Sequence, residues 1–153
     1  MANTYSQVYI HIVFAVQGRL NLIPENHREE LQKYITGIIS KRNQKLLAIY
    51  SNPDHTHIFV GMKPELSISD LVRDVKAGSS KFINDKKWVV GKFNWQKGAG
   101  SFSHSHSQID TVVKYVNNQK EHHHKRTFKE EYLEMLKNFA VDYDDRYLFE
   151  WLE

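Results

Sequence analysis

Residues 46–62 read LLAIYSNPDHTHIFVGM, and this stretch decides the fold. Leu46 to Tyr50 is a short apolar run, Asn52-Pro53-Asp54 is a turn signal, and His55 to Met62 is again strand-like. Two strands joined by so short a turn pair in an antiparallel fashion. The stretch therefore predicts a β-hairpin.

The segments on either side of the hairpin show strand and helix patterns in turn. Val8 to Ala15 alternates between an apolar and a mixed face, as a β-strand does. Glu25 to Arg42 carries apolar residues at helical spacing, and a second helix from Ser67 to Asn84 begins with a Ser-x-x-Asp start signal. A fourth strand is expected within Trp88 to His106, where glycines indicate a flexible loop.

Helical spacing returns after the fourth strand. Apolar residues recur at i, i+3, i+4 and i+7 in the set Ile109, Val112, Val113 and Val116. They predict a third helix from about Ser107 to Glu121, and a fourth is expected from Phe128 to Phe139. The order β-α-β-β-α-β followed by helices indicates an α+β fold of the ferredoxin-like, or RRM-like, plan. We expect an antiparallel sheet with helices on one face and an added C-terminal helix that carries Tyr115.

Length and composition fit one domain that spans residues 1–153. Of the 153 residues, 41% are hydrophobic, which is enough for a single core. The longest apolar stretch, Val8 to Val16, is interrupted by His11 and is far shorter than the roughly 18 to 20 residues of a membrane helix. Met1 to Gln7 lacks the features of a secretory signal. No membrane span is expected, and the predicted location is the cytoplasm.

Charge and cysteine content limit the chemistry. Lys and Arg total 21 against 18 Asp and Glu, a formal net charge of +3 that is compatible with a polyanionic partner. No cysteine occurs, which excludes disulfides, thiolate metal sites and cysteine nucleophiles. A metal site must therefore use nitrogen and oxygen ligands, for which nine histidines are available.

Two histidines stand two residues apart on the second strand of the hairpin. Because side chains alternate along a strand, His55 and His57 should project to one face with Phe59, while Thr56 takes the other. Imidazole suits several divalent ions, and oxygen ligands could complete such a site while leaving positions for phosphate oxygens. The pattern alone also fits a pair of polar residues on an exposed sheet face.

Tyr115 and Gln119 are four residues apart on the predicted third helix, hence neighbours on its surface. At about 100° per residue, the centre of the apolar stripe lies roughly 110° from Tyr115 and about 70° from Gln119. Tyr115 is therefore not a central core residue. The helix alone leaves open that Tyr115 flanks the core and Gln119 is solvated.

Together the motifs resemble the single-tyrosine HUH transposases of small bacterial insertion sequences, including the REP-associated type. Residues 53–60, PDHTHIFV, and 115–119, YVNNQ, carry the resemblance. It extends in order and spacing to four further segments, 9–14, 69–80, 95–103 and 122–131. One departure is Thr56, which takes the middle position of the His-hydrophobic-His motif, although its β-branched side chain still suits a strand.

The resemblance implies a DNA transposase that cuts and rejoins single-stranded DNA at hairpin-flanked element ends. His55, His57 and Gln119 would hold Mg²⁺ or Mn²⁺ at the scissile phosphate, and Tyr115 would attack the phosphorus. A 5′-phosphotyrosine and a free 3′-hydroxyl would result, so that the strand could be rejoined without ATP. Tyrosine has an ordinary pKa of about 10 and needs a nearby cation to act as an oxyanion near neutral pH, which agrees with a metal.

The resemblance also implies hairpin DNA as the partner and a homodimer in which the tyrosine helix of one subunit faces the histidine pair of the other. Basic residues on the second helix and near the tyrosine helix are candidate phosphate contacts: Arg73, Lys76, Lys81, Lys114, Lys120, Lys125 and Arg126. His104 and His106 repeat the His-x-His spacing in a Ser-rich stretch and are interpreted as a decoy. His122 to His124 are interpreted first as a frayed helix end, with alternative metal ligands or DNA contacts as the other two interpretations.

Three other functions stay open from the residues alone. A non-catalytic module for single-stranded nucleic acid would use the same kind of sheet without metal. A metal-dependent hydrolase or ribonuclease would use water as the nucleophile and should survive Tyr115→Phe. A domesticated relative would bind dispersed genomic repeats instead of mobilising its own element.

Overall fold

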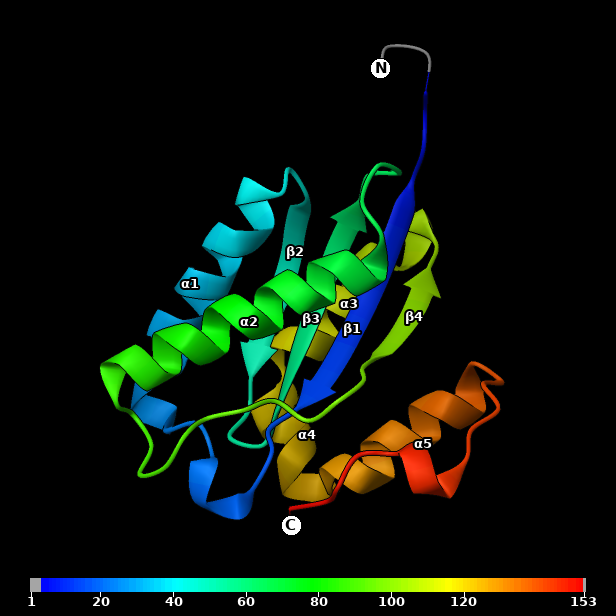
Figure 1. Cartoon of the computed structure of the whole chain (residues 1–153). Helices are drawn as coiled ribbons and strands as arrows, with labels where there is room; N and C mark the ends of the chain where they lie inside the picture. Colours follow the sequence, from blue (N-terminus) through cyan, green and yellow to red (C-terminus); the bar gives the residue numbers. More distant parts are fainter. Residues whose placement is uncertain (1–3, 153) are drawn as a thin grey trace.

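A four-stranded antiparallel sheet forms the centre of the molecule (Figure 1). The structure is a computed structural model that describes residues 4–152, apart from the side chains of His123 and His124. The strands are β1 (Val8–Ala15), β2 (Lys45–Ser51), β3 (His55–Met62) and β4 (Gly100–His104), in the order β2-β3-β1-β4. This is the ferredoxin-like order, so the predicted fold is confirmed.

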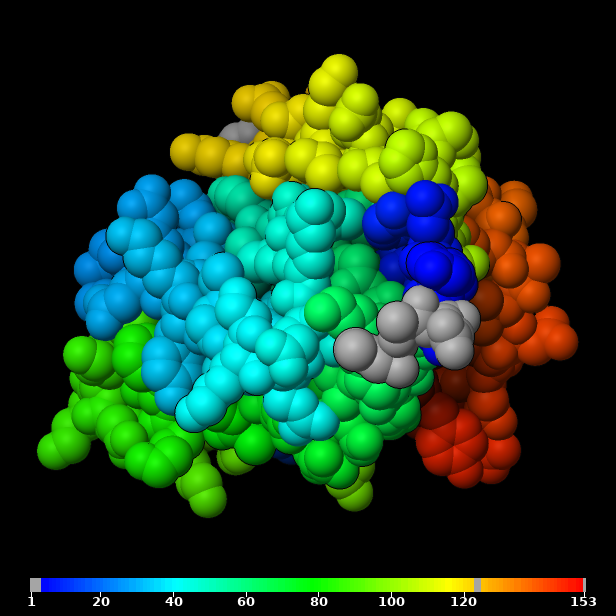
Figure 2. Space-filling model, turned by 90° about the horizontal axis from the view of Figure 1, so that it is seen from above, coloured from blue at the N-terminus to red at the C-terminus, as the bar shows by residue number. Residues whose placement is uncertain are grey.

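Helices cover both faces of the sheet. α1 (Arg28–Lys41) and α2 (Ile68–Lys86) pack together on one face. α3 (Ile109–Asn117) lies on the opposite face over β2 and β3, as Figures 1 and 2 show. α4 (Gln119–Lys125) and α5 (Phe128–Asn138) follow it along the chain. Within residues 4–152, no helix has both the length and the apolar character needed to cross a membrane.

Alternation along β1 divides the interior into two layers. The side chains of Ile10, Ile12 and Phe14 enter the main core together with residues of α1 and α2. Val13 and Ala15 face the other way and pack against α5 through Phe128, Tyr132 and Leu136. His11 is a buried polar residue on this second face. The second layer therefore holds α5 against the centre of the sheet.

Two element boundaries differ from the sequence pattern. A 3-10 turn at Glu25–His27 precedes α1, where the helix was expected to begin. The prediction of one helix to about Glu121 is wrong, because the backbone leaves helical geometry at Asn118 (φ −99°, ψ 24°) and continues as α4. Asparagine disfavours helix interiors because its side chain competes for backbone hydrogen bonds. Tyr115 and Gln119 consequently lie on different helices.

Gly100 lies where β4 passes closest to α5. A Cβ at this position would come within 2.8 Å of Tyr132 Cε1 and 3.0 Å of Tyr132 Cζ. Tyr132 is only 5% exposed and packs against the rings of Phe102, Phe128 and Phe149. We expect Gly100→Ala to lower the free energy of unfolding by about 1–3 kcal/mol through this overpacking, as measured by urea titration.

Gly37 in α1 supplies the matched control, since no heavy atom lies within 4 Å of its hypothetical Cβ. Gly37→Ala should raise the free energy of unfolding by about 0.5–1 kcal/mol, because alanine loses less conformational entropy in a helix. Similar behaviour of the two variants would show that β4 and α5 do not pack as closely as described.

Candidate active site

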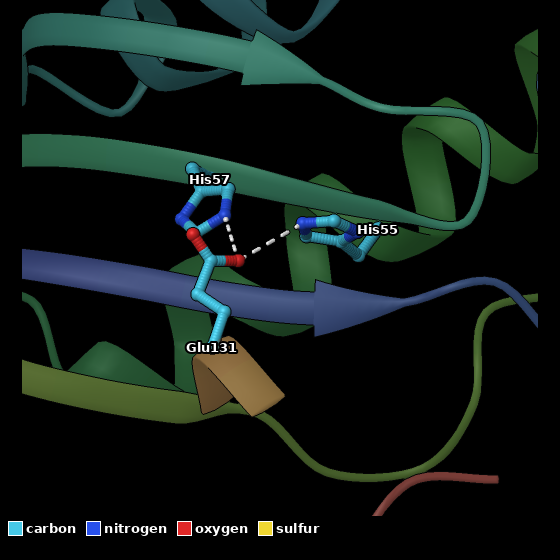
Figure 3. A group of neighbouring side chains, drawn as sticks. All are labelled: His55, His57 and Glu131. Atoms are coloured by element: carbon cyan, nitrogen blue, oxygen red, sulfur yellow. Dashed lines mark hydrogen bonds and ion pairs between the residues drawn. The ribbon is translucent and has the colours of Figure 1, made fainter. Parts of the chain in front are cut away.

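His55 and His57 meet a carboxylate from the C-terminal part of the chain. Both imidazoles leave β3 on one face, as the alternation predicted, and both are completely buried. Glu131 Oε1, from α5, lies 3.4 Å from His55 Nε2 and 3.3 Å from His57 Nε2. Figure 3 shows the three side chains converging from the strand and the helix. One ligand atom from each lies within 4.8 Å of the others, a spacing that fits a shared metal ion.

The first turn of α5, which carries Glu131, is held in place by a helix cap and by a ring stack. The Thr127 side chain accepts a hydrogen bond from Glu130 N, and the Glu130 carboxylate accepts one from Thr127 N, which forms a capping box. The ring of Phe128 stacks on His55 with the ring centroids 3.8 Å apart. These contacts fix the direction in which Glu131 points.

Tyr115 reaches the same carboxylate from α3. Its hydroxyl donates a hydrogen bond to Glu131 Oε2. The Tyr115 ring lies edge-on to His57, with the centroids 6.0 Å apart, and packs against the His122 ring at 4.6 Å. A single chain thus brings its own tyrosine to its own histidine pair.

Gln119, the first residue of α4, is completely buried beside Glu131. Its Nε2 donates to Glu131 Oε2 at 3.2 Å, and its Oε1 accepts from Asn52 Nδ2 at 3.3 Å. The four predicted site residues therefore lie together: His55, His57, Tyr115 and Gln119. The histidines face Glu131, and the role of Gln119 as a metal ligand stays a prediction.

Each histidine of the pair also has a partner at its second ring nitrogen. Asp54 Oδ1 lies 2.7 Å from His55 Nδ1, and His11 Nε2 lies 2.8 Å from His57 Nδ1. In both rings this leaves Nε2 directed at Glu131. Metal-binding histidines usually have such an outer partner, which sets the orientation of the ring.

The buried charges shift the pKa values of the cluster in different directions. Burial would raise the pKa of Glu131, but His57 and His55 outweigh it and hold that pKa well below its usual range. Burial lowers the pKa of His57. At Tyr115, burial and then the charge of Glu131 raise the pKa of the phenol. Without a metal, the site therefore holds an ionised carboxylate and a protonated tyrosine.

Metal affinity should depend on the protonation of His55. Burial alone would lower the pKa of His55, but its hydrogen bonds to Asp54 and Glu131 outweigh burial and raise it above the ordinary 6.5. An ion must displace this proton, so the Kd for Mn²⁺ should fall as pH rises, by up to about tenfold per pH unit below that pKa. Calorimetric titrations between about pH 6 and pH 8 would measure both the Kd and the proton release. A constant Kd without proton release would contradict this.

Glu131 is the site residue that sequence reasoning missed. It lies 74 positions after His57. A signal was present in α5, where Glu131 shares the buried face of an amphipathic helix with Phe128, Tyr132 and Leu136. A carboxylate at such a core position indicates a buried charge that must have a partner.

In the part of the chain that the structure describes, no second group of His, Asp or Glu side chains has a spacing that fits a metal ion. His104 Nδ1 lies 3.2 Å from Gln108 Oε1, and the ring of His106 faces Tyr9 with the centroids 6.0 Å apart. Residues 122–124 lie in the last turn of α4, which ends at Lys125, and their interpretation as a frayed helix end stays a prediction. The side chains of His123 and His124 lie outside the described residues.

The predicted DNA contacts have different surroundings. Arg73 and Lys81 form ion pairs with acidic residues one turn away on α2. Lys76 is half-buried, and its ammonium donates to two backbone carbonyls of the segment before β4. Lys114 and Lys120 are exposed on the two helices that carry the tyrosine and the glutamine. Their contacts with DNA stay predictions.

The model of the IS200-like transposase family matches residues 4–119 of this sequence. The chain belongs to the IS200-like transposase family. Two solved structures are similar to this transposase in fold. A protein of Deinococcus radiodurans R1 assigned as a transposase has a TM-score of 0.59 and 19% identity, covering 76% of this chain and 94% of its own. The REP-associated tyrosine transposase bound to a REP hairpin has a TM-score of 0.59 and 14% identity, covering 79% and 72%.

These likenesses confirm the family and the fold at the level that the sequence resemblance implied. No curated protein matches this transposase.

Proposed function

We propose that this transposase cuts and rejoins single-stranded DNA at hairpin-flanked element ends through a covalent 5′-phosphotyrosine. One observation carries the proposal: Glu131 accepts the Tyr115 hydrogen bond on Oε2 and faces both histidines with Oε1. The group that would attack and the group that would hold an ion therefore meet at one carboxylate. Family membership supports DNA as the substrate, and the REP hairpin bound by one structural neighbour supports a hairpin.

Tyr115 is the proposed nucleophile. Its oxygen would bond to phosphorus and the bond from phosphorus to the 3′ oxygen would break. The phenol proton would be lost to solvent, and the leaving 3′ oxygen would take up a proton from solvent to become the free 3′-hydroxyl. Glu131 Oε2 would orient the tyrosine hydroxyl before the attack by accepting its hydrogen bond. Glu131 and burial hold the proton on Tyr115 in the metal-free chain, because they raise its pKa. Arg126 opposes them, since its positive charge favours the phenolate.

His55, His57 and Glu131 are the residues that would hold Mg²⁺ or Mn²⁺, with Gln119 as the further predicted ligand. Two imidazoles and a carboxylate form a mixed nitrogen and oxygen donor set that divalent metals accept. When bound, the ion supplies positive charge that neutralises the scissile phosphate and favours the tyrosine oxyanion. Asp54 and His11 keep the two imidazoles directed at Glu131.

The placement of all these groups in one chain supports catalysis in cis, whereas the homodimer with shared sites stays a prediction. Mixing Tyr115→Phe chains with His57→Ala chains distinguishes the two. Catalysis in cis predicts no cleavage by the mixture, because each chain lacks one group. Recovered cleavage, together with a dimer in light scattering, would establish the exchange of tyrosines between subunits.

The proposed function is tested with the purified protein and a pool of end-labelled single-stranded DNA hairpins, with Mg²⁺ or with EDTA, on a denaturing protein gel. The expected result is a labelled protein band that requires metal. Cleaved DNA without a labelled protein band would instead identify a hydrolase that uses water. Hairpin binding without cleavage at any metal concentration would identify a binding module.

A further inference from the structure

His11 is a buried imidazole on the strand next to the histidine pair. It lies on β1 in register with Phe59 of β3 and is 3% exposed. Its Nε2 lies 2.8 Å from His57 Nδ1, and the two rings stack with centroids 5.0 Å apart at 21°. The next residues on this face of β1 are the apolar Val13 and Ala15. On this face of β1, the imidazole lies between Tyr9 and Val13, at the position that contacts His57.

We propose that His11 is a positioning residue for the ion site, and that its hydrogen bond with His57 reverses direction when the ion binds. The inference rests on the proposed function, because it requires His57 to be a metal ligand.

In the metal-free chain, His57 faces a carboxylate. His57 Nε2 lies 3.3 Å from Glu131 Oε1, and only a protonated Nε2 can donate to that oxygen. A neutral imidazole carries one hydrogen, so His57 Nδ1 is then an acceptor. His11 must be the donor, from its Nε2, across the 2.8 Å contact.

With an ion bound, the same contact must run the other way. Ligation needs the lone pair of His57 on Nε2, which moves the ring hydrogen to Nδ1. His57 then donates, and His11 Nε2 accepts while its own hydrogen sits on Nδ1. Both rings change tautomer, and the number of protons that they carry together stays the same.

The requirement for both directions explains why an imidazole suits position 11. A carboxylate or a backbone carbonyl could only accept, and an ammonium could only donate. An imidazole does either without a change of charge, so His57 keeps a partner and one ring orientation in both states. Asp54, the partner of His55, is a carboxylate and offers acceptor oxygens alone when ionised.

Mn²⁺ binding by two variants of His11 tests the positioning role. Because loss of an outer partner costs about 10–100-fold in metal affinity, we expect a loss of this size in His11→Phe. His11→Gln should bind nearly as the wild type does, since an amide both donates and accepts. His104→Phe is the matched control: it makes the same change on the adjacent strand, 6.3 Å from the His11 ring, and should leave affinity unchanged.

Hydrogen positions are measured directly in the wild type by long-range ¹H–¹⁵N NMR, without reference to activity. We expect the hydrogen on Nε2 of both rings in the metal-free protein and on Nδ1 of both rings with Mg²⁺. Unchanged tautomers on binding would overturn the proposal, and so would wild-type affinity in folded His11→Phe. Equal Mn²⁺ binding by the wild type and His57→Ala would overturn the proposed ion site and this inference with it. That result is distinct from unchanged tautomers or from wild-type affinity in His11→Phe, which would overturn the role of His11 alone.

Discussion

Tyr115→Phe should abolish the covalent DNA adduct and reduce cleavage on the order of 10⁴-fold or more, the scale seen when a nucleophile is removed. Only the hydroxyl is lost. The ring contacts with His57 and His122 can persist, and Glu131 Oε2 keeps its hydrogen bond from Gln119. Mn²⁺ binding and hairpin binding should therefore stay close to those of the wild type. A denaturing gel measures the adduct, and calorimetry measures the ion.

Tyr132→Phe is the control for this experiment. Tyr132 is also buried, and burial raises its pKa to about 12, but the hydroxyl of Tyr115 is the one that contacts Glu131. The control should form the adduct. Continued cleavage by Tyr115→Phe, with free ends and no labelled protein, would assign the attack to water and contradict the tyrosine mechanism.

Glu131→Gln should remove ion binding and catalysis together, although the side chain keeps its size. Glutamine lacks the negative charge, and a neutral amide is a weaker ligand for a divalent ion than a carboxylate is. Loss of an outer partner of a metal ligand costs about 10–100-fold in metal affinity, and the loss of Mn²⁺ affinity in Glu131→Gln should be larger. Cleavage should fall together with affinity. Titration calorimetry measures the affinity, and the denaturing gel measures the covalent adduct.

Glu130→Gln is the matched control, because it makes the same change one residue earlier on the exposed side of α5. Glutamine can still complete the capping box with Thr127, so the helix should be unaffected. Equal Mn²⁺ affinity in the two variants would show that Glu131 is not a metal ligand. Gln119 would then be the third predicted ligand beside His55 and His57.

The same pair of variants should differ in stability. The pKa of Glu131 is held below its ordinary 4.5 in the folded chain, so its carboxylate stabilises the fold above that pH. Urea titrations of the metal-free proteins should therefore show Glu131→Gln less stable than Glu130→Gln near neutral pH. The difference should shrink as the pH falls through the range in which the folded carboxylate takes up a proton.

The sheet and the histidine pair could be predicted because their signals are local. Alternation reports which face of a strand is buried, and the Asn52-Pro53-Asp54 turn fixes which strands pair. These two facts place His55 and His57 on one face, as found. The tyrosine helix was likewise visible from its apolar spacing, and the resemblance of the sequence to a family gave Tyr115 its predicted role.

The third member of the cluster could not be predicted in this way. A buried carboxylate is tolerated only with partners, and the partners of Glu131 come from a strand far earlier in the chain. The break at Asn118 is likewise not visible in the apolar spacing, because Val112 and Val116 would allow the helix to continue. Periodicity reports neither a contact between distant segments nor a local break at one asparagine.

The strand order has a consequence for how the molecule is made. β1 is synthesised first, yet it lies between β3 and β4, so its two edges wait for partners that end at Met62 and His104. Pairings so distant in sequence form slowly, and an apolar strand with open edges can associate with other chains meanwhile. Glu131 follows later still. A chain growing from its N-terminus therefore contains all four strands of the sheet before it contains the carboxylate that completes the proposed ion site.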